Sequence, residues 1–267
     1  MSFQPVIAGP GLAGWRFLQR TYDQQAAVFN SAPQIRRDTE YFAARIGEVT
    51  SAEQLVADRR LMRVALGAFG LSADIDNRYF LRKILEEGTL RDDALANRLA
   101  DPRYKAFSAA FAFGDRPVPR TALATFPGEI IAKFQAQQFE VAVGDQDQTM
   151  RLALNLKRAL PGLLAKDASE DTKWFEIMGT PPLRKVFETA LGLPPGFAQI
   201  DLDQQLATLK EKSARQLDVG SIAELGDAGT LDRLVQSYLV RAQISQGAVL
   251  SSGTIALSLL AAATPAP

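Results

Sequence analysis

Three glycines near the start of the chain have the spacing of a nucleotide-binding loop. Gly9, Gly11 and Gly14 match the pattern G-x-G-x-x-G after a short apolar run, and in that motif the following helix N-terminus receives a pyrophosphate. Pro10 removes a backbone donor inside the loop, and no later strand–helix–strand units follow. We therefore interpret residues 1–14 as an irregular lead-in and expect no cofactor.

Closely spaced carboxylates could bind a hard cation or share a proton. The closest pairs are Asp92 with Asp93 and Asp201 with Asp203, but residues two apart on a helix do not share a face. Residues 145–149 (DQDQT) carry oxygen side chains on alternate positions, yet lack the glycine and glutamate of a calcium loop. Helix capping explains all three groups better, so we expect no metal site and no catalytic residue.

Basic and aromatic side chains also have simpler explanations than a ligand site. We expect nearby acids, Asp58, Glu86 and Glu87, to neutralise the densest basic cluster, which consists of Arg59, Arg60, Arg63, Arg82 and Lys83. Core packing rather than a ligand cage accounts for the aromatic residues on apolar helix faces, which are Phe42, Phe69, Phe80, Phe107, Phe111, Phe175 and Phe187.

Composition removes several classes of function. The chain has no cysteine and no histidine, which excludes thiol nucleophiles, Ser-His-Asp triads and thiolate or imidazole zinc sites. Thirty basic side chains balance thirty acidic ones, so nothing indicates a nucleic-acid partner. We expect the protein not to be an enzyme.

Helical periodicity dominates the 267 residues, and alternating runs of β-branched residues are nearly absent. The fold class is therefore predicted to be all-α and multihelical. Leu61–Leu71 and Leu183–Leu193 repeat one apolar face, one helix-stopping glycine and one closing leucine, which is typical of a Schellman ending. This match predicts two related helical halves, an internal repeat, packed together.

Capping residues predict where several helices begin. Thr50 and Ser51 start two overlapping capping boxes, from which one long helix is expected to run to Gly70. Other predicted starts are Asp101-Pro102, Thr180-Pro181 and Thr230. Gly114 is expected to end the helix that begins at Asp101-Pro102.

Composition and proline content divide the chain into four segments. We predict an N-terminal segment and first helix (1–37), a first helical half (38–116), a linker with long helices and the second half (117–242), and an apolar C-terminal tail (243–267).

The N-terminus lacks the basic region and apolar run of a cleavable secretory signal. No apolar run is long enough for a membrane span, and no charged residue follows Arg241. The tail is interpreted as docked on the core or, alternatively, as meeting a partner or an export machinery.

Four stretches resemble a bacterial family of unknown function, DUF1217. They are DTEYF (38–42), VTSAEQLVADRRLMRVALGAFGL (49–71), LADPRYKAFSAAFAFG (99–114) and FEVAVGDQDQTMRLAL (139–154). The resemblance implies a multihelical fold without assigned catalytic or ligand residues. It also implies a flagellum-associated, non-enzymatic role, because genes of this family commonly lie in flagellar clusters of alphaproteobacteria.

These observations favour a helical structural or interaction protein that binds another protein, plausibly a flagellar component. Two alternatives stay open at this point. One is a flagellar export chaperone, and the other is a small-ligand binder or carboxylate-based hydrolase with a site between the two halves. The expected location is cytoplasmic or flagellum-associated.

Overall fold

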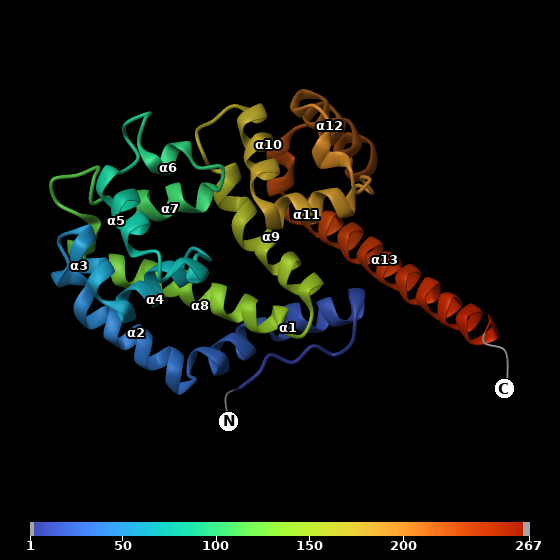
Figure 1. The fold of residues 1–267 in the computed structure, drawn as a ribbon, viewed down its shortest axis with the longest axis horizontal. Coiled ribbons are helices and arrows are strands. Elements are labelled where there is room, and N and C mark those ends of the chain that lie inside the picture. Colours follow the sequence, from blue (N-terminus) through green and yellow to red (C-terminus); the bar gives the residue numbers. More distant parts are fainter. Residues whose placement is uncertain (1–2, 264–267) are drawn as a thin grey trace. The chain divides into compact units, whose positions relative to one another are not determined.

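A computed structural model describes residues 3–263, with side chains described as far as Ser245. Within these residues the chain forms thirteen α-helices and no strand, which confirms the all-α prediction (Figure 1). The chain divides into two compact units. Unit 1 contains the first residues up to Val6 and Arg20–Gln146, and unit 2 contains Ile7–Gln19 and the chain from Asp147 onward. The four-segment division and the internal repeat stay predictions.

Unit 1 is built from short helices around an aromatic core. Its helices are the second part of α1 (Gly11–Asn30), α2 (Pro33–Arg45), α3 (Ala52–Ala57), α4 (Arg59–Gly67), α5 (Arg78–Glu87), α6 (Leu95–Arg98), α7 (Pro102–Phe111) and α8 (Phe126–Gly144). Helix α4 packs on both α2 and α8, and α5 packs on α3 and α7. Four helices therefore surround α4 and α5 and hold them in place.

Phe111 lies at the centre of the largest aromatic group in unit 1. Its ring centroid is 5.2 Å from Phe107, 5.1 Å from Phe126 and 5.9 Å from Phe113, which are favourable separations for aromatic pairs. The rings of Phe107, Phe111 and Phe126 are completely buried. This confirms core packing for Phe107 and Phe111.

The long helix expected from Ser51 to Gly70 is wrong, because the chain breaks it at Asp58. Ser51 caps α3, accepting a hydrogen bond from the Gln54 backbone N–H at 3.2 Å. Asp58 then takes an extended conformation and caps α4 by accepting from the N–H groups of Arg60 and Leu61. An aspartate competes for backbone donors better as an N-cap than inside a helix, so two short helices replace one long one.

The two glycine-stopped helix ends have the same hydrogen-bond pattern. Gly70 and Gly192 both have positive φ, at 71° and 60°. The N–H of Leu71 donates to the carbonyl of Leu66 at 2.9 Å, and the N–H of Leu193 donates to Glu188 at 2.8 Å. These are the six-to-one bonds of a Schellman ending, as the sequence predicts.

Helix α7 ends before its predicted glycine. Ala112, not Gly114, adopts the left-handed conformation with φ of 56°, and its N–H donates to the Ser108 carbonyl at 2.8 Å. Gly114 serves a different purpose, since a Cβ there would lie 2.3 Å from the Glu86 carbonyl oxygen. It is needed for the close approach of two backbone segments.

Unit 2 combines the beginning of α1 with the C-terminal helices. These are α9 (Gln148–Leu164), α10 (Glu170–Gly179), α11 (Pro181–Ala190), α12 (Leu202–Leu217) and α13 (Ala228–Ala263). Helix α11 packs against α9, α10 and α13, and its buried Phe187 meets Trp174 of α10 at a centroid distance of 5.7 Å. Trp15 and Leu18 of α1 are also buried.

Of the two helix starts predicted at threonines, the one at Thr180-Pro181 is confirmed, although the Thr180 hydroxyl makes no cap bond, and the one at Thr230 is wrong. Thr180 precedes α11, but its hydroxyl donates backwards to the Glu176 carbonyl at 2.8 Å and Pro181 begins the helix without a side-chain cap. Thr230 lies inside α13, and Asp227 accepts from its backbone N–H at 3.0 Å. A carboxylate is the stronger acceptor, which explains why Asp227 replaces the threonine.

The glycines of the nucleotide-binding pattern have a local structural explanation. Gly9 and Gly11 have positive φ, at 99° and 64°. A Cβ on Gly14 would lie 1.8 Å from the Gly9 carbonyl oxygen, so the backbone of the loop occupies the space directly above the helix. The spacing therefore reflects a tight turn into α1.

Candidate interaction surfaces

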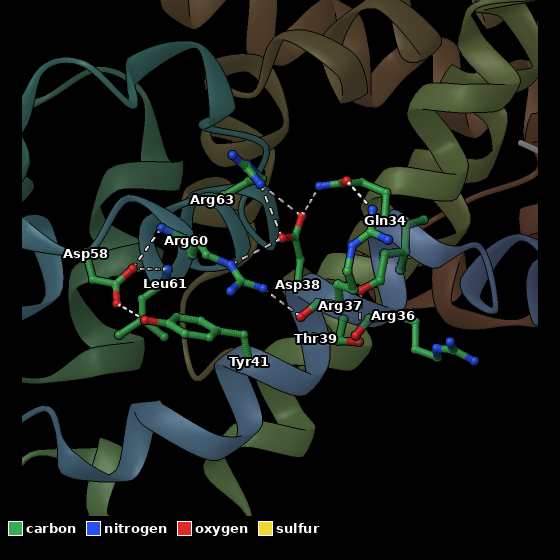
Figure 2. Close-up of polar contacts among 11 residues, drawn as sticks. Gln34, Arg36, Arg37, Asp38, Thr39, Tyr41, Asp58, Arg60, Leu61 and Arg63 are labelled. Atoms are coloured by element: carbon green, nitrogen blue, oxygen red, sulfur yellow. Dashed lines mark hydrogen bonds and ion pairs between the residues drawn. The ribbon is translucent and has the colours of Figure 1, made fainter.

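A buried carboxylate joins α2 to α4 in unit 1 (Figure 2). Only 5% of the Asp38 side chain is exposed. Arg63 donates to both of its carboxylate oxygens at 3.2 Å, and Gln34 donates to Oδ2 at 2.9 Å. The Arg60 guanidinium lies 4.0 Å from Oδ1. Since buried charges need partners of this kind, these three side chains satisfy Asp38.

Asp58 anchors the other side of the same network. The Tyr41 hydroxyl donates to its Oδ2 at 2.6 Å, and the Arg60 guanidinium stacks on the Tyr41 ring at 3.9 Å. Burial raises the pKa of Asp58, but the hydrogen bonds from Tyr41, Leu61 and Arg60 outweigh it, so this pKa lies below its usual value. The same hydrogen bond raises the pKa of Tyr41.

The side chains of this network position one another. Every carboxylate oxygen of Asp38 and Asp58 accepts a hydrogen bond from within the network. Arg60 and Arg63 remain roughly half-exposed, so their outer edges can meet solvent. We interpret the cluster as a polar clamp that fixes α4 on α2.

Sequence reasoning missed the centre of this clamp. In the sequence Asp38 stands out only as part of the stretch DTEYF, and Asp58 is predicted to neutralise the arginines. Instead Asp58 caps α4, while Arg60 and Arg63 pair with Asp38 and Arg59 pairs with Asp76. A sequence signal existed, because Asp38 lies one turn from both Gln34 and Tyr41 on the same helix face.

The remaining charged residues of interest lie apart from one another. Arg82 pairs with Glu53 and Glu86, and Lys83 pairs with Glu87, so the acids Glu86 and Glu87 do neutralise this part of the basic cluster. The described residues contain no group of three or more acids placed to hold a metal ion.

Capping accounts for two of the three groups of acids singled out in the sequence. Helix α6 follows Asp92 and Asp93 but has no side-chain cap, so the capping interpretation of that pair is wrong. Asp201 caps α12 and Asp147 caps α9, each accepting two backbone N–H bonds. Asp93 instead pairs with Arg91 in a loop. The capping interpretation of residues 145–149 and of Asp201 is therefore confirmed.

We expect Asp58→Ala to lower the free energy of unfolding by about 1–2 kcal/mol, the usual cost of losing an N-cap. Because the pKa of Asp58 is lowered on folding, its contribution is present above about pH 4 and is lost as the pH falls through the folded value. Urea titrations at neutral and acid pH measure both effects. Asp58→Asn keeps the cap and serves as the control; an equal loss in both variants would contradict the capping role.

Tyr104 makes a second tyrosine–carboxylate contact in unit 1. Its hydroxyl donates to Asp74 at 2.8 Å, and burial together with this bond raises the pKa of Tyr104 to about 12. A raised tyrosine pKa stabilises the fold below about pH 10, the ordinary value, and this contribution is lost as the pH rises towards the folded value. In the ultraviolet absorbance of the native protein we therefore expect Tyr104 to ionise well above pH 10, whereas it should ionise near pH 10 after unfolding. Tyr104→Phe should lower the late-ionising absorbance of the native protein by that of one tyrosine, because Tyr41 and Tyr238 also have raised pKa values.

A groove of about 640 Å³ lies on unit 2 beside the end of α11. The loop Gly192–Pro195 forms one wall, and α13 forms the other with Val240 and Ile244. These two α13 side chains are 41% and 65% exposed. A second, smaller groove on unit 1 is lined by Val56, Ala57, Glu53, Arg78, Tyr79 and Arg82.

Helix α13 continues beyond this groove to Ala263 as one 36-residue helix (Figure 1). From residue 242 onward the sequence contains no charged side chain. None of the helices in the described part of the chain is sufficiently long and apolar to cross a membrane. The prediction that the tail docks on the core concerns residues 246–267, whose side chains lie outside the described part of the chain.

Fold and surfaces define an all-α protein with two helical units, a polar clamp in one and a groove in the other. The chain belongs to the family described as "Protein of unknown function (DUF1217)", whose model matches residues 68–230. A crystal structure of a protein from Agrobacterium tumefaciens is similar, with a TM-score of 0.74 and 24% identity over 91% of this chain and 98% of that one. That likeness shows the fold alone. No protein with a curated description matches the chain.

Proposed function

We propose that the protein is a non-enzymatic helical interaction protein that acts in the flagellum or in its assembly. One observation carries the interaction part: α13 exposes Val240 and Ile244 beside a groove and continues as a helix without any charged residue after Arg241. Exposed apolar surfaces of this kind typically mark protein–protein contacts. The flagellar part is supported by the gene context that the family resemblance implies.

A deletion in a motile bacterium that encodes this protein tests the flagellar part. We expect loss or reduction of swimming, restored by the full-length gene. A mutant with normal flagella and normal swimming would contradict the proposal. Asp58→Asn, which keeps the cap, is a suitable control for complementation because it leaves the α13 surface unchanged.

Affinity purification from motile cells tests the interaction part. Full-length tagged protein is compared with a chain that stops after Arg241, and we expect flagellar proteins to copurify only with the former. Copurification of one axial subunit in a stoichiometric complex would favour the export-chaperone alternative. Equal recovery with both chains would move the interaction away from α13.

A further inference from the structure

Residues 3–6 form a strap that is bound to the second part of α1 within unit 1. The strap precedes α1 in the chain and is dark blue in Figure 1. The N–H of Val6 donates to Gln25 Oε1 at 2.6 Å, and Gln25 Nε2 donates back to the carbonyl of Val6 at 3.1 Å. One side-chain amide therefore binds both backbone groups of one residue, as a neighbouring strand does in an antiparallel β ladder.

Gln25 is oriented for this contact by its own helix. Only 6% of the residue is exposed, and its Nε2 also donates to the Thr21 hydroxyl, one turn earlier on α1, at 2.7 Å. This bond fixes which end of the amide donates and which accepts. A buried amide needs hydrogen-bond partners, so Gln25 favours an occupant that offers an N–H and a carbonyl where Val6 offers them.

A second glutamine binds the residue before Val6. Gln146 Nε2 donates to the carbonyl of Pro5, and Pro5 is buried whereas Gln4 and Val6 on either side are exposed. Proline has no N–H, so its burial leaves no backbone donor without a partner. These contacts give the strap one buried ring and three hydrogen bonds to its main chain.

Contacts of this kind have the chemistry of peptide recognition. In a bound extended peptide, hydrogen bonds to the main chain supply affinity and pockets for particular side chains supply specificity. Here the bonds from both glutamines go to main-chain atoms, and 52% of Val6 is exposed. The buried ring of Pro5 is therefore the feature that selects the sequence. The surface fits an extended segment in which a proline precedes a residue with a free N–H.

We propose that the strap masks a peptide-binding site of unit 1, which consists of Gln25, Gln146 and the surface that buries Pro5. A partner protein occupies this site by displacing the strap with an extended segment of its own, in which a proline takes the place of Pro5 and a non-proline residue follows it. The proposed function concerns α13 in unit 2, so that function and this site can fail independently.

The connection between the strap and the rest of the chain determines how strongly the site is masked. Residues 7–10 link the strap to α1, and Gly9 within them has a φ of 99°, a conformation that glycine adopts without strain. A short flexible link gives the attached segment an effective concentration of about millimolar. A free peptide must compete with that concentration, so the natural chain should bind a free copy of its own strap weakly.

Fluorescence anisotropy with a labelled peptide of residues 2–9 (SFQPVIAG) tests the masking on the full chain. Pro5→Asp and Val6→Pro together weaken the strap, because they expel the buried ring and remove the N–H that Gln25 accepts. Loss of a hydrogen bond to a buried group weakens binding by about tenfold or more. We therefore expect this double variant to bind the peptide about tenfold more tightly than the natural chain.

Two further chains serve as controls in the same titration. Adding Gln25→Ala to the double variant should remove the gain in affinity, because the peptide loses its main-chain partner. Val6→Ala alone changes only an exposed side chain, so this matched control should bind the peptide as weakly as the natural chain does. A double variant without any gain, or a gain that survives Gln25→Ala, would overturn the proposal.

Amide exchange in the natural chain tests displacement without any substitution. In isotope-labelled full chain, observed by nuclear magnetic resonance, we expect the bonded N–H of Val6 to be protected from exchange. An excess of the unlabelled peptide should accelerate exchange at Val6, while the N–H of Leu71, bonded within its Schellman ending, should exchange at its original rate. An unprotected Val6 amide, or one that the peptide does not accelerate, would contradict a displaceable strap.

Discussion

Replacing Phe111 with alanine is expected to lower the free energy of unfolding by about 3–5 kcal/mol, which is typical for a buried phenylalanine. The ring is fully buried and lies within 6 Å, centroid to centroid, of Phe107, Phe113 and Phe126. Its removal leaves a cavity that the three large rings around it cannot readily fill. Because aromatic pairs add stability beyond area burial, the loss should be near the upper end of that range.

Hydrogen exchange followed by mass spectrometry is the appropriate measurement, because two units need not unfold together. We expect faster exchange in peptides from residues 20–146 and little change in those from 147–245. Tyr79→Ala, at a site 74% exposed, is the control and should cost less than about 0.5 kcal/mol. Equal effects of Phe111→Ala on both sets of peptides would contradict the division into two units.

Replacing Asp38 with alanine is expected to cost about 2–3 kcal/mol. The carboxylate makes charge-assisted hydrogen bonds to Arg63 and a bond to Gln34, and such bonds contribute about 1.5–3 kcal/mol. Loss of a buried ion partner can cost more, but Arg60 and Arg63 are half-exposed and can turn to water. The expected loss of stability for Asp38→Ala is therefore smaller than the loss caused by breaking a fully buried ion pair.

Equilibrium urea unfolding of three chains distinguishes charge from packing at this site. Asp38→Asn keeps the shape and part of the hydrogen bonding, so we expect about half the loss of Asp38→Ala. Arg63→Gln removes the donor, so it should lower the free energy of unfolding by an amount similar to that of Asp38→Asn. If Asp38→Asn were as stable as the natural chain, the charge of Asp38 would have no part in fixing α4 on α2.

Local sequence signals predicted the features that depend on neighbouring residues. The two Schellman endings at Gly70 and Gly192 follow from a glycine and one apolar residue, and both have the expected bonds. Asp101 caps α7 as predicted, accepting from the Arg103 N–H at 2.9 Å. The all-α class follows from periodicity summed over the whole chain, where single errors matter little.

The predictions are wrong where two local signals compete, or where the partner of a side chain lies far away in the sequence. Asp58 is compatible with a helix interior by periodicity, but its caps on the N–H groups of Arg60 and Leu61 and its contact with Tyr41 favour the break. Ala112 adopts a conformation that usually selects glycine. Asp38 finds Arg60 and Arg63 more than twenty residues away on α4, a pairing that no spacing rule on one helix predicts.

The division of the chain also fixes an order of events during synthesis. Trp15 and Leu18 leave the ribosome early, but the helices of unit 2 that bury them begin only after Asp147. At about 5–20 residues per second, on the order of 10 seconds pass before those helices emerge. During that interval unit 1 can fold, while the side chain of Trp15 remains exposed to solvent. Newly made chains thus pass through a stage in which chaperones have a defined target, and a stalled ribosome would leave that target uncovered.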